Sequence, residues 1–329
     1  MTLLLDDEDV RAACVLPDLV SSLADGLRKG GEASGALLPE RMNLTLGAKF
    51  LRVMPAVLPE AGVYGLKFFQ GSMAEGVRYL ILIGSLASGE LLAGLDAAYL
   101  TAARTGATSA VATAALARAD AASVGVIGSG LEARTNLLSI AAVRPLADVR
   151  VYSRSPQRRA AFAAEMTQQL GIPVTAGESP AEAVAGRDIV LVATNTGANG
   201  PVAFRGELVE EGQHLVSIGS TSPTLREIDP ATFTCADLVV LDAPPEQVSR
   251  ESGDVIELKR EWPDWDEPVS LGDLLAGRAT GRRSAREVTL FKSVGTAEQD
   301  LIAALHVYET ARRRGIGRDV PELAQPKLF

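Results

Sequence analysis

The stretch Ser123-Val124-Gly125-Val126-Ile127-Gly128-Ser129-Gly130-Leu131-Glu132-Ala133 decides the fold of this chain. It opens with a short apolar run, typical of a buried parallel strand, and a helical pattern follows the last two glycines. Gly128 permits a tight turn, Gly130 leaves space beside the backbone, and Ala133 lets the helix lie close to the strand. The amides and positive dipole at the helix start favour a pyrophosphate. The motif therefore predicts a bound dinucleotide, although a glycine-rich strand exit without a ligand has the same spacing.

Further strands and helices alternate after this stretch. Short apolar runs at residues 149–152, 189–193, 215–218 and 238–241 are separated by helical segments and turns. Alternating strands and helices of this length form a parallel sheet with helices on both faces. We therefore predict an α/β fold whose central part is a Rossmann-type doubly wound parallel sheet.

The end of the second strand indicates which dinucleotide binds. An acidic residue at this place accepts hydrogen bonds from the adenine ribose of NAD. Here the strand is followed by Ser153-Arg154-Ser155, without a carboxylate. Arg154 can pair with a 2′-phosphate through a charge-assisted fork, which favours NADP(H). NAD(H) stays possible, since Arg154 also fits a solvated loop arginine that stacks on adenine.

Length and composition limit the other classes of function. At 329 residues the chain is long enough for two domains, and its net charge of −9 argues against a nucleic-acid partner. No apolar run is long enough for a membrane span, and the amino terminus lacks the basic region of a signal peptide. Cys14 and Cys235 lack metal-type spacing, which predicts reduced thiols and a cytoplasmic location. For His214 and His306, the two histidines, we expect structural roles, and we expect no metal site.

The segments on either side of the Rossmann pattern predict a different architecture. Leucine and valine at helical spacing predict a helix over residues 17–31, which ends at glycines. Residues 41–95 alternate in short strands, which favours a mostly antiparallel sheet. An alanine-rich helix is predicted over residues 96–116, and a final helix over residues 296–314 ends at a glycine. Together these elements predict an α+β unit.

Three cations precede the glycine motif in unusual settings. Arg41 begins an alternating strand, Lys67 lies in an apolar strand, and Arg104 lies in the alanine-rich helix. Lys and Arg are almost never buried without a partner. Three such residues that converge on a cleft form a site for a carboxylate, whereas separately each is a side chain that points to solvent. Their spacing in the sequence leaves both interpretations open.

Motifs along almost the whole chain resemble the ornithine cyclodeaminase/μ-crystallin family. They are Arg104-Thr105-Gly106-Ala107-Thr108-Ser109-Ala110, Gly125-Val126-Ile127-Gly128-Ser129-Gly130, and Phe291-Lys292-Ser293-Val294-Gly295 followed by Gln299-Asp300. Val53-Met54-Pro55-Ala56 and His214-Leu215-Val216-Ser217-Ile218-Gly219 match as well. The motifs keep the order and spacing of the family, so together they are specific.

The resemblance implies a homodimer. In each chain a Rossmann domain, residues 121–296, is inserted into a substrate-binding and dimerisation domain, residues 1–120 plus 297–329. The resemblance also implies that Arg41, Lys67 and Arg104 bind the carboxylate of a small imino- or amino-acid substrate, with Lys67 and Arg104 as catalytic residues. With the turn after the second strand included, the predicted cofactor-binding residues are Gly128, Ser129, Gly130, Leu131, Glu132, Ser153, Arg154, Ser155, Thr194, Asn195, Ser217, Gly219, Val294 and Gly295.

One position separates the activities within the family. True ornithine cyclodeaminases resemble this chain around residues 218–223, but they carry an aspartate, which engages the distal amine, where Thr221 stands. Thr221, which we count among the substrate-binding residues, is neutral and cannot take the proton of that amine. The chain is therefore more similar to the NADPH-dependent ketimine reductases. This predicts reduction of a C=N carboxylate such as pyrroline- or piperideine-2-carboxylate. The alternatives are an ornithine or lysine cyclodeaminase with bound NAD, an amino-acid dehydrogenase, and a non-enzymatic, crystallin-like NADPH-binding protein.

Overall fold

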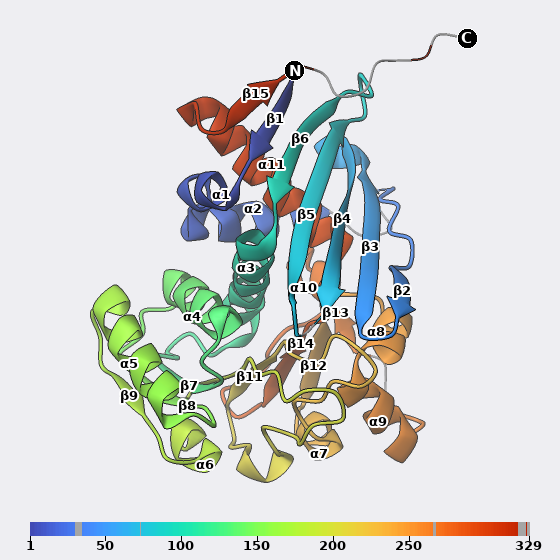
Figure 1. The fold of residues 1–329 in the computed structure, drawn as a ribbon. Helices are drawn as coiled ribbons and strands as arrows, with labels where there is room; N and C mark the ends of the chain where they lie inside the picture. Colours follow the sequence, from blue (N-terminus) through green and yellow to red (C-terminus); the bar gives the residue numbers. More distant parts are fainter. Residues whose placement is uncertain (30–34, 73, 266–267, 322–326, 328–329) are drawn as a thin grey trace. The chain divides into compact units, whose positions relative to one another are not determined.

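The computed structural model describes residues 1–29, 35–72, 74–265, 268–321 and 327. The chain forms two compact units. Unit 1 comprises Met1–Arg104 and Thr296–Phe329, and unit 2 comprises Thr105–Gly295. Each unit has its own sheet and its own helices (Figure 1). Unit 2 is thus an insertion between two segments that together build unit 1.

The first division between the units falls inside helix α3 (Ala98–Leu116), earlier than the boundary at residues 120/121 expected from the sequence. Most of this helix packs within unit 2. A Cβ atom on Gly106 would lie 2.6 Å from the carbonyl oxygen of Thr135, so the two backbones touch. The hydroxyl of Thr113 lies 3.3 Å from Nε2 of His214. Small residues permit this close approach, which explains why the alanine-rich pattern belongs to the second unit.

Unit 1 contains a seven-stranded sheet in the order β15-β1-β6-β5-β4-β3-β2. All neighbouring strands are antiparallel except β1 and β6, which are parallel. This confirms the mostly antiparallel sheet expected from the alternation in residues 41–95. The strands are β1 (Thr2–Leu5), β2 (Met42–Leu46), β3 (Lys49–Leu58), β4 (Val63–Ser72), β5 (Gly76–Ser85), β6 (Leu91–Asp96) and β15 (Arg318–Val320).

In the described part of unit 1 the helices are α1 (Asp7–Ala13), α2 (Leu16–Lys29), the short 3₁₀ helix η2 (Pro59–Ala61), α11 (Ala297–Arg314) and the first residues of α3. Helix α11 crosses the sheet on one face and packs against β3, β4, β5 and α2 (Figure 1). Its ends form as the sequence predicts: Thr296 accepts a hydrogen bond from the amide of Gln299, and Gly315 ends the helix with a φ of 67°. The glycines expected to end α2 lie outside the described residues.

Unit 2 contains an eight-stranded sheet in the order β13-β12-β14-β11-β10-β7-β8-β9. All its strands are parallel, which confirms the doubly wound sheet. The sequence did not predict β14, which lies between β11 and β12, because Lys292 interrupts its short apolar run. The strands are β7 (Ser123–Ile127), β8 (Asp148–Tyr152), β9 (Val174–Ala176), β10 (Ile189–Val192), β11 (His214–Ser217), β12 (Leu238–Leu241), β13 (Val269–Ser270) and β14 (Thr289–Lys292).

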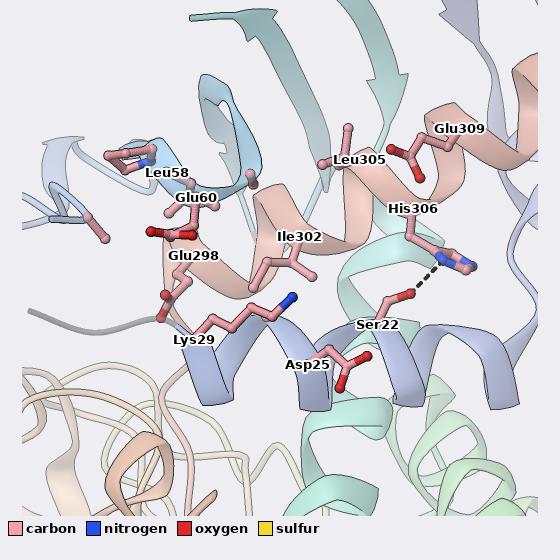
Figure 2. A pocket seen from close by; sticks show the side chains of 14 residues that line it. Ser22, Asp25, Lys29, Leu58, Glu60, Glu298, Ile302, Leu305, His306 and Glu309 are labelled. Carbon is pink, nitrogen blue, oxygen red and sulfur yellow. Dashed lines mark hydrogen bonds between the residues drawn. The ribbon is translucent and has the colours of Figure 1, made fainter. Parts of the chain in front are cut away.

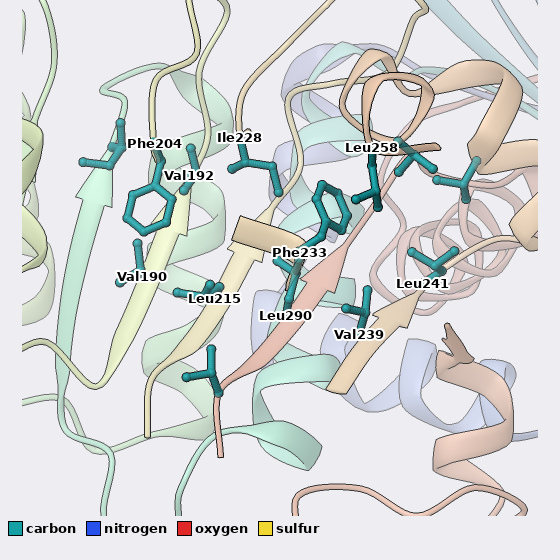
Figure 3. Close-up of a cluster of buried hydrophobic side chains, with 14 of the residues drawn as sticks. Val190, Val192, Phe204, Leu215, Ile228, Phe233, Val239, Leu241, Leu258 and Leu290 are labelled. Carbon is teal, nitrogen blue, oxygen red and sulfur yellow. The ribbon is translucent and has the colours of Figure 1, made fainter. Parts of the chain in front are cut away.

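One hydrophobic cluster of unit 2 lies on one face of this sheet. Val190, Leu215 and Leu290 come from adjacent strands, and the rings of Phe204 and Phe233 pack over them (Figure 3). Each such side chain contributes roughly 1.5–3 kcal/mol to the stability of the unit when fully buried. The other helices of unit 2 are α4 (Leu131–Val143), α5 (Pro156–Leu170), α6 (Pro180–Val184), α7 (Pro230–Thr234), α8 (Pro245–Glu251), α9 (Gly253–Glu261) and α10 (Leu271–Leu275).

Candidate active site

Lys67 is buried in the middle of the unit 1 sheet. It lies on β4, opposite Met54 of β3 and Ile81 of β5, and its side chain is only 2% exposed. An ammonium group at such a place requires a counterion. That counterion is Asp300, in the first turn of α11, whose Oδ1 and Oδ2 lie 2.8 Å and 2.7 Å from Nζ of Lys67. The apolar strand and the first turn of α11 therefore meet at an ion pair.

Arg104 joins the same carboxylate. Its Nε atom donates to Oδ1 of Asp300 at 2.8 Å, and its NH1 atom donates to Oε1 of Gln299 at 2.9 Å. Arg41 lies just before β2, is 9% exposed, and acts electrostatically on Lys67. The structure thus brings the three predicted cations together. We call Arg41, Lys67, Arg104 and Asp300 the cation cluster.

The cation cluster changes the acidity of Lys67. Burial lowers its pKa from 10.5 to about 8, and the positive charges of Arg104 and Arg41 act in the same direction, while Asp300 opposes them. Burial alone would raise the pKa of Asp300, but the charges of Lys67 and Arg104 prevail, and the pKa of this carboxyl is lowered. The cluster thus contains three cations beside the carboxylate of Asp300. A substrate carboxylate fits such a group of cations.

Asp300 was not among the predicted site residues. Its only signal in the sequence was its place in one of the matched motifs. An acidic residue in the first turn of a helix already has an ordinary explanation, since it stabilises the positive end of the helix dipole. Only the tertiary structure shows that Asp300 is completely buried and faces two cations.

The glycine motif of unit 2 forms the turn that the sequence predicts. Gly128 has a φ of 123°, and a Cβ atom there would lie 2.1 Å from the carbonyl oxygen of Ala193. Gly130 caps the amino terminus of α4, and a Cβ atom there would meet nothing within 4 Å. The space beside Gly130 and the amides at the start of α4 fit a pyrophosphate. Leu131 is 44% exposed beside this turn, and Glu132 is half-buried.

The turn after β8 lies beside this motif. Oγ of Ser129 donates to Oγ of Ser153 at 2.9 Å. Ser155 caps α5 and accepts a hydrogen bond from the amide of Arg158. Arg154 is exposed, and its guanidinium donates to the carbonyl oxygen of Asn195 at 3.3 Å. A guanidinium at the end of β8 therefore lies next to the loop that follows β10.

The remaining predicted cofactor residues lie in loops after the strands. Thr194 and Asn195 follow β10, while Ser217 ends β11 and Gly219 follows it. Thr221 lies in the same loop after β11 and is half-buried. The amides of Val294 and Gly295, after β14, donate to Asp242 at 2.9 Å and 3.0 Å. All these loops leave the carboxyl ends of parallel strands, where ligands of such sheets bind.

The two histidines occupy structural positions. His214 is completely buried, and its Nδ1 atom lies 2.9 Å from the hydroxyl of Thr289. His306 lies 2.8 Å from the hydroxyl of Ser22 and lines a cavity of about 290 Å³ between α2, α11 and residues 58–61 (Figure 2). Successive residues of a helix are turned by about 100°, so this cavity faces the side of α11 opposite Asp300.

None of the helices in the described part of the chain has the length and apolar character needed to cross a membrane. Among the same residues, no group of three or more histidine, cysteine or acidic side chains is arranged to hold a metal ion.

Comparisons with known proteins extend over nearly the whole chain. A relative from Bacillus cereus, a Δ1-pyrroline-2-carboxylate reductase, is 32% identical over 92% of this chain and 89% of its own length. The structure of a Δ1-pyrroline-2-carboxylate reductase from Thermococcus litoralis, in complex with NADH and L-proline, matches with a TM-score of 0.89 and 32% identity, covering 97% of this chain and all of that one. An archaeal alanine dehydrogenase dimer with bound NAD matches with a TM-score of 0.88 and 29% identity, covering 97% of this chain and 99% of that one.

The sequence model of a single family matches residues 2–315, with the description ornithine cyclodeaminase/μ-crystallin family. The match includes the cation cluster, the glycine motif and all the loops described above. It confirms the resemblance seen in the motifs. The chain therefore belongs to the ornithine cyclodeaminase/μ-crystallin family.

Proposed function

We propose that the protein is a nicotinamide-dependent oxidoreductase that reduces a ketimine carboxylate to the corresponding imino or amino acid. Pyrroline-2-carboxylate and piperideine-2-carboxylate are the expected substrates. The observation that carries this proposal is the buried cation cluster, which brings together two guanidinium groups that can bind a carboxylate and an ammonium whose pKa is about 8. The similarity to two Δ1-pyrroline-2-carboxylate reductases supports the same substrate class.

The residues of the cation cluster have separate roles in this proposal. Arg104 and Arg41 bind the substrate carboxylate, because a guanidinium offers several donors in a fixed plane. Asp300 holds Lys67 and Arg104 in place through its two oxygen atoms. Lys67, whose pKa of about 8 lies close to neutrality, keeps a proton at Nζ that it can deliver to the imine nitrogen. The cofactor supplies the hydride when it is bound.

We propose NADPH as the preferred cofactor. The turn after β8 has no carboxylate to repel a 2′-phosphate, and the guanidinium of Arg154 is exposed beside it. The two amides that follow Gly130 and the open space at this glycine provide the pyrophosphate site. The Thermococcus relative was solved with NADH, so the preference depends on Arg154 rather than on the fold.

Two related activities have weaker support. An amino-acid dehydrogenase catalyses the opposite reaction, the oxidation of an amino acid, and the archaeal alanine dehydrogenase has the same fold. For a cyclodeaminase, the neutral side chain of Thr221 is unfavourable, because it cannot accept a proton from a distal amine. We therefore place reduction of a cyclic ketimine first.

We also propose that the chain acts as a homodimer in the cytoplasm. Met42, Leu44 and Leu46 of the edge strand β2 point to one side and are 55%, 54% and 84% exposed. An apolar edge strand of this kind favours association. Light scattering of the purified protein should give twice the chain mass, and Leu44→Asp should reduce it to one chain mass.

The test of the proposed activity uses both cyclic ketimines with NADPH. We expect oxidation of NADPH in proportion to the imino acid formed. Release of ammonia from ornithine, with no net change in the cofactor and no reaction with either ketimine, would exclude the proposal. Tight NADPH binding without any turnover would instead support a non-enzymatic binding protein.

A further inference from the structure

Glu227 is a completely buried acidic residue that joins two loops of unit 2. Its Oε1 atom accepts hydrogen bonds from the amide and the hydroxyl of Thr194, at 2.6 Å and 3.1 Å. Its Oε2 atom accepts from the hydroxyl of Ser217 at 2.8 Å and from the amides of Ile218 and Gly219 at 3.0 Å and 2.7 Å. Thr194 follows β10, and the other three donors end or follow β11.

All five of these partners are donors. A carboxylate accepts only, whereas a protonated carboxyl group must also donate, so the contacts fit the ionised form of Glu227. Burial and the charge of Asp254 raise the pKa of Glu227, and the charge of Lys292 and the amides of Thr194 and Gly219 reduce this rise without reversing it. Gly219 has no side chain to obstruct the arrangement, because a Cβ atom there would lie 2.5 Å from Oε1 of Glu227.

A second layer of buried charges anchors Glu227 itself. Oδ1 of Asp254 accepts from the amide of Glu227 at 2.8 Å, and Oδ2 of Asp254 lies 3.0 Å from Nζ of Lys292. Lys292, on β14, also donates to the hydroxyl of Ser217 at 3.0 Å. The next residue, Ile228, is fixed in the apolar core (Figure 3). The backbone of Glu227 is therefore fixed by Asp254 on one side and by the burial of Ile228 on the other.

We propose that Glu227 is a positioning residue that holds the loops after β10 and β11 in their cofactor-binding form before the cofactor arrives. The inference rests on the proposed cofactor site of unit 2. The two loops leave neighbouring parallel strands at their carboxyl ends, and they contain Thr194, Asn195 and Gly219. Without the carboxylate, five donors lose their common acceptor, and the loops are no longer fixed in the free protein. Cofactor binding must then supply the free energy that orders the loops, which lowers the affinity.

Asp188 provides a control at the amino ends of the strands in the same sheet. Its Oδ2 atom accepts from the amides of Ala122 and Ser123, both at 3.0 Å, and from the hydroxyl of Ser123 at 2.7 Å. Asp188 directly precedes β10, and Ser123 begins β7, so this carboxylate joins segments at the amino ends of the strands. Like Glu227, Asp188 is a carboxylate that accepts from amides and a hydroxyl, and it also pairs with Arg118, at a place where no ligand is expected.

The experiment compares Glu227→Gln with Asp188→Asn by fluorescence titration of NADPH and NADH and by thermal unfolding. In Glu227→Gln an amide NH₂ group replaces one oxygen and faces donors, so we expect a Kd at least about tenfold higher for both nucleotides. Both variants should unfold at a lower temperature. Asp188→Asn should keep the Kd within about twofold of the wild type, since it disturbs only the amino ends of the strands, away from the proposed cofactor site.

Two results would overturn the inference. One is a folded Glu227→Gln protein with an unchanged Kd, and the other is an equal loss of affinity in both variants. If Glu227→Gln does not fold, hydrogen exchange of the wild-type protein without cofactor decides. The amides of Thr194, Ile218 and Gly219 should be protected, and rapid exchange would refute the inference. If the wild type itself binds neither nucleotide, the proposed function fails, whereas normal wild-type binding with an unaffected variant refutes only the role of Glu227.

Discussion

Replacement of Asp300 by asparagine tests the cation cluster directly. The change keeps the shape of the side chain and removes the negative charge that Lys67 and Arg104 share. The pKa of Lys67 is already lowered from 10.5 to about 8 with this carboxylate in place. At about 1.4 kcal/mol for each pH unit, the surroundings of Lys67 taken together, Asp300 included, therefore oppose its protonated form by roughly 3 kcal/mol. Without Asp300 the pKa of Lys67 must fall further.

The size of the further fall decides the outcome at neutral pH. Removal of one partner from a buried ion pair costs about 3–5 kcal/mol. About 1.4 kcal/mol is enough to bring the pKa of Lys67 from about 8 to 7. We therefore expect Lys67 to be neutral at pH 7 in Asp300→Asn, and the alkaline limb of kcat/KM to move down by more than about one pH unit.

The assay follows NADPH absorbance with pyrroline-2-carboxylate between pH 5 and 10, a range chosen on either side of the pKa of about 8. The substrate's own protonation is the same for each protein, so the difference between the profiles reports on the enzyme. Glu309→Gln is the matched control, because Glu309 is exposed on the cavity side of α11 (Figure 2). An alkaline limb at the same pH in Asp300→Asn and the wild type would refute the proposed role of Lys67.

Four other tests, which use six substitutions, address separate parts of the structure. Lys67→Met should lower kcat by roughly 10²–10⁴-fold with cofactor affinity unchanged in titrations, since it removes the proton donor. Arg154→Ala should raise the Kd of NADPH about tenfold or more, with little effect on NADH, whereas Arg150→Ala, in the middle of β8, should change neither. Gly130→Ala should weaken cofactor binding, and it should leave thermal stability unchanged because a Cβ atom at this position meets nothing within 4 Å. Gly128→Ala should lower thermal stability, because a Cβ atom there would lie 2.1 Å from a carbonyl oxygen. Burial, with the charges of Arg282 and Arg144, lowers the pKa of His214 from 6.5 to about 3. Between these pH values the unfolded state binds a proton that the folded state does not, so the free energy of unfolding should fall as the pH decreases from 6.5 to about 3. His214→Gln should make this fall smaller in denaturant titrations.

Local signals in the sequence were sufficient for much of the fold. The apolar runs at β7, β8, β10, β11 and β12 lie where the sequence placed them, because buried parallel strands require continuous apolar residues. The glycine that ends α11 was also predicted, because Gly315 has the left-handed backbone conformation that favours glycine at a helix end. Strand β14 was missed because its four residues, Thr289–Lys292, contain a lysine whose partners lie far away in the sequence.

The sequence by itself determined the parts of the site whose chemistry depends on backbone conformation. Glycine readily adopts the φ of Gly128 and leaves the space beside Gly130, so the nucleotide motif could be identified from the sequence alone. The sequence also named Arg41, Lys67 and Arg104, but it left open whether they converge.

The tertiary structure decided which charges meet. Asp300 is 233 residues from Lys67 and 196 from Arg104 along the chain, yet it accepts hydrogen bonds from both. Glu227 likewise joins loops whose connection has no periodic signal. A buried charge depends on the position of its counterion, and that position is set by the packing of strands and helices rather than by neighbouring residues.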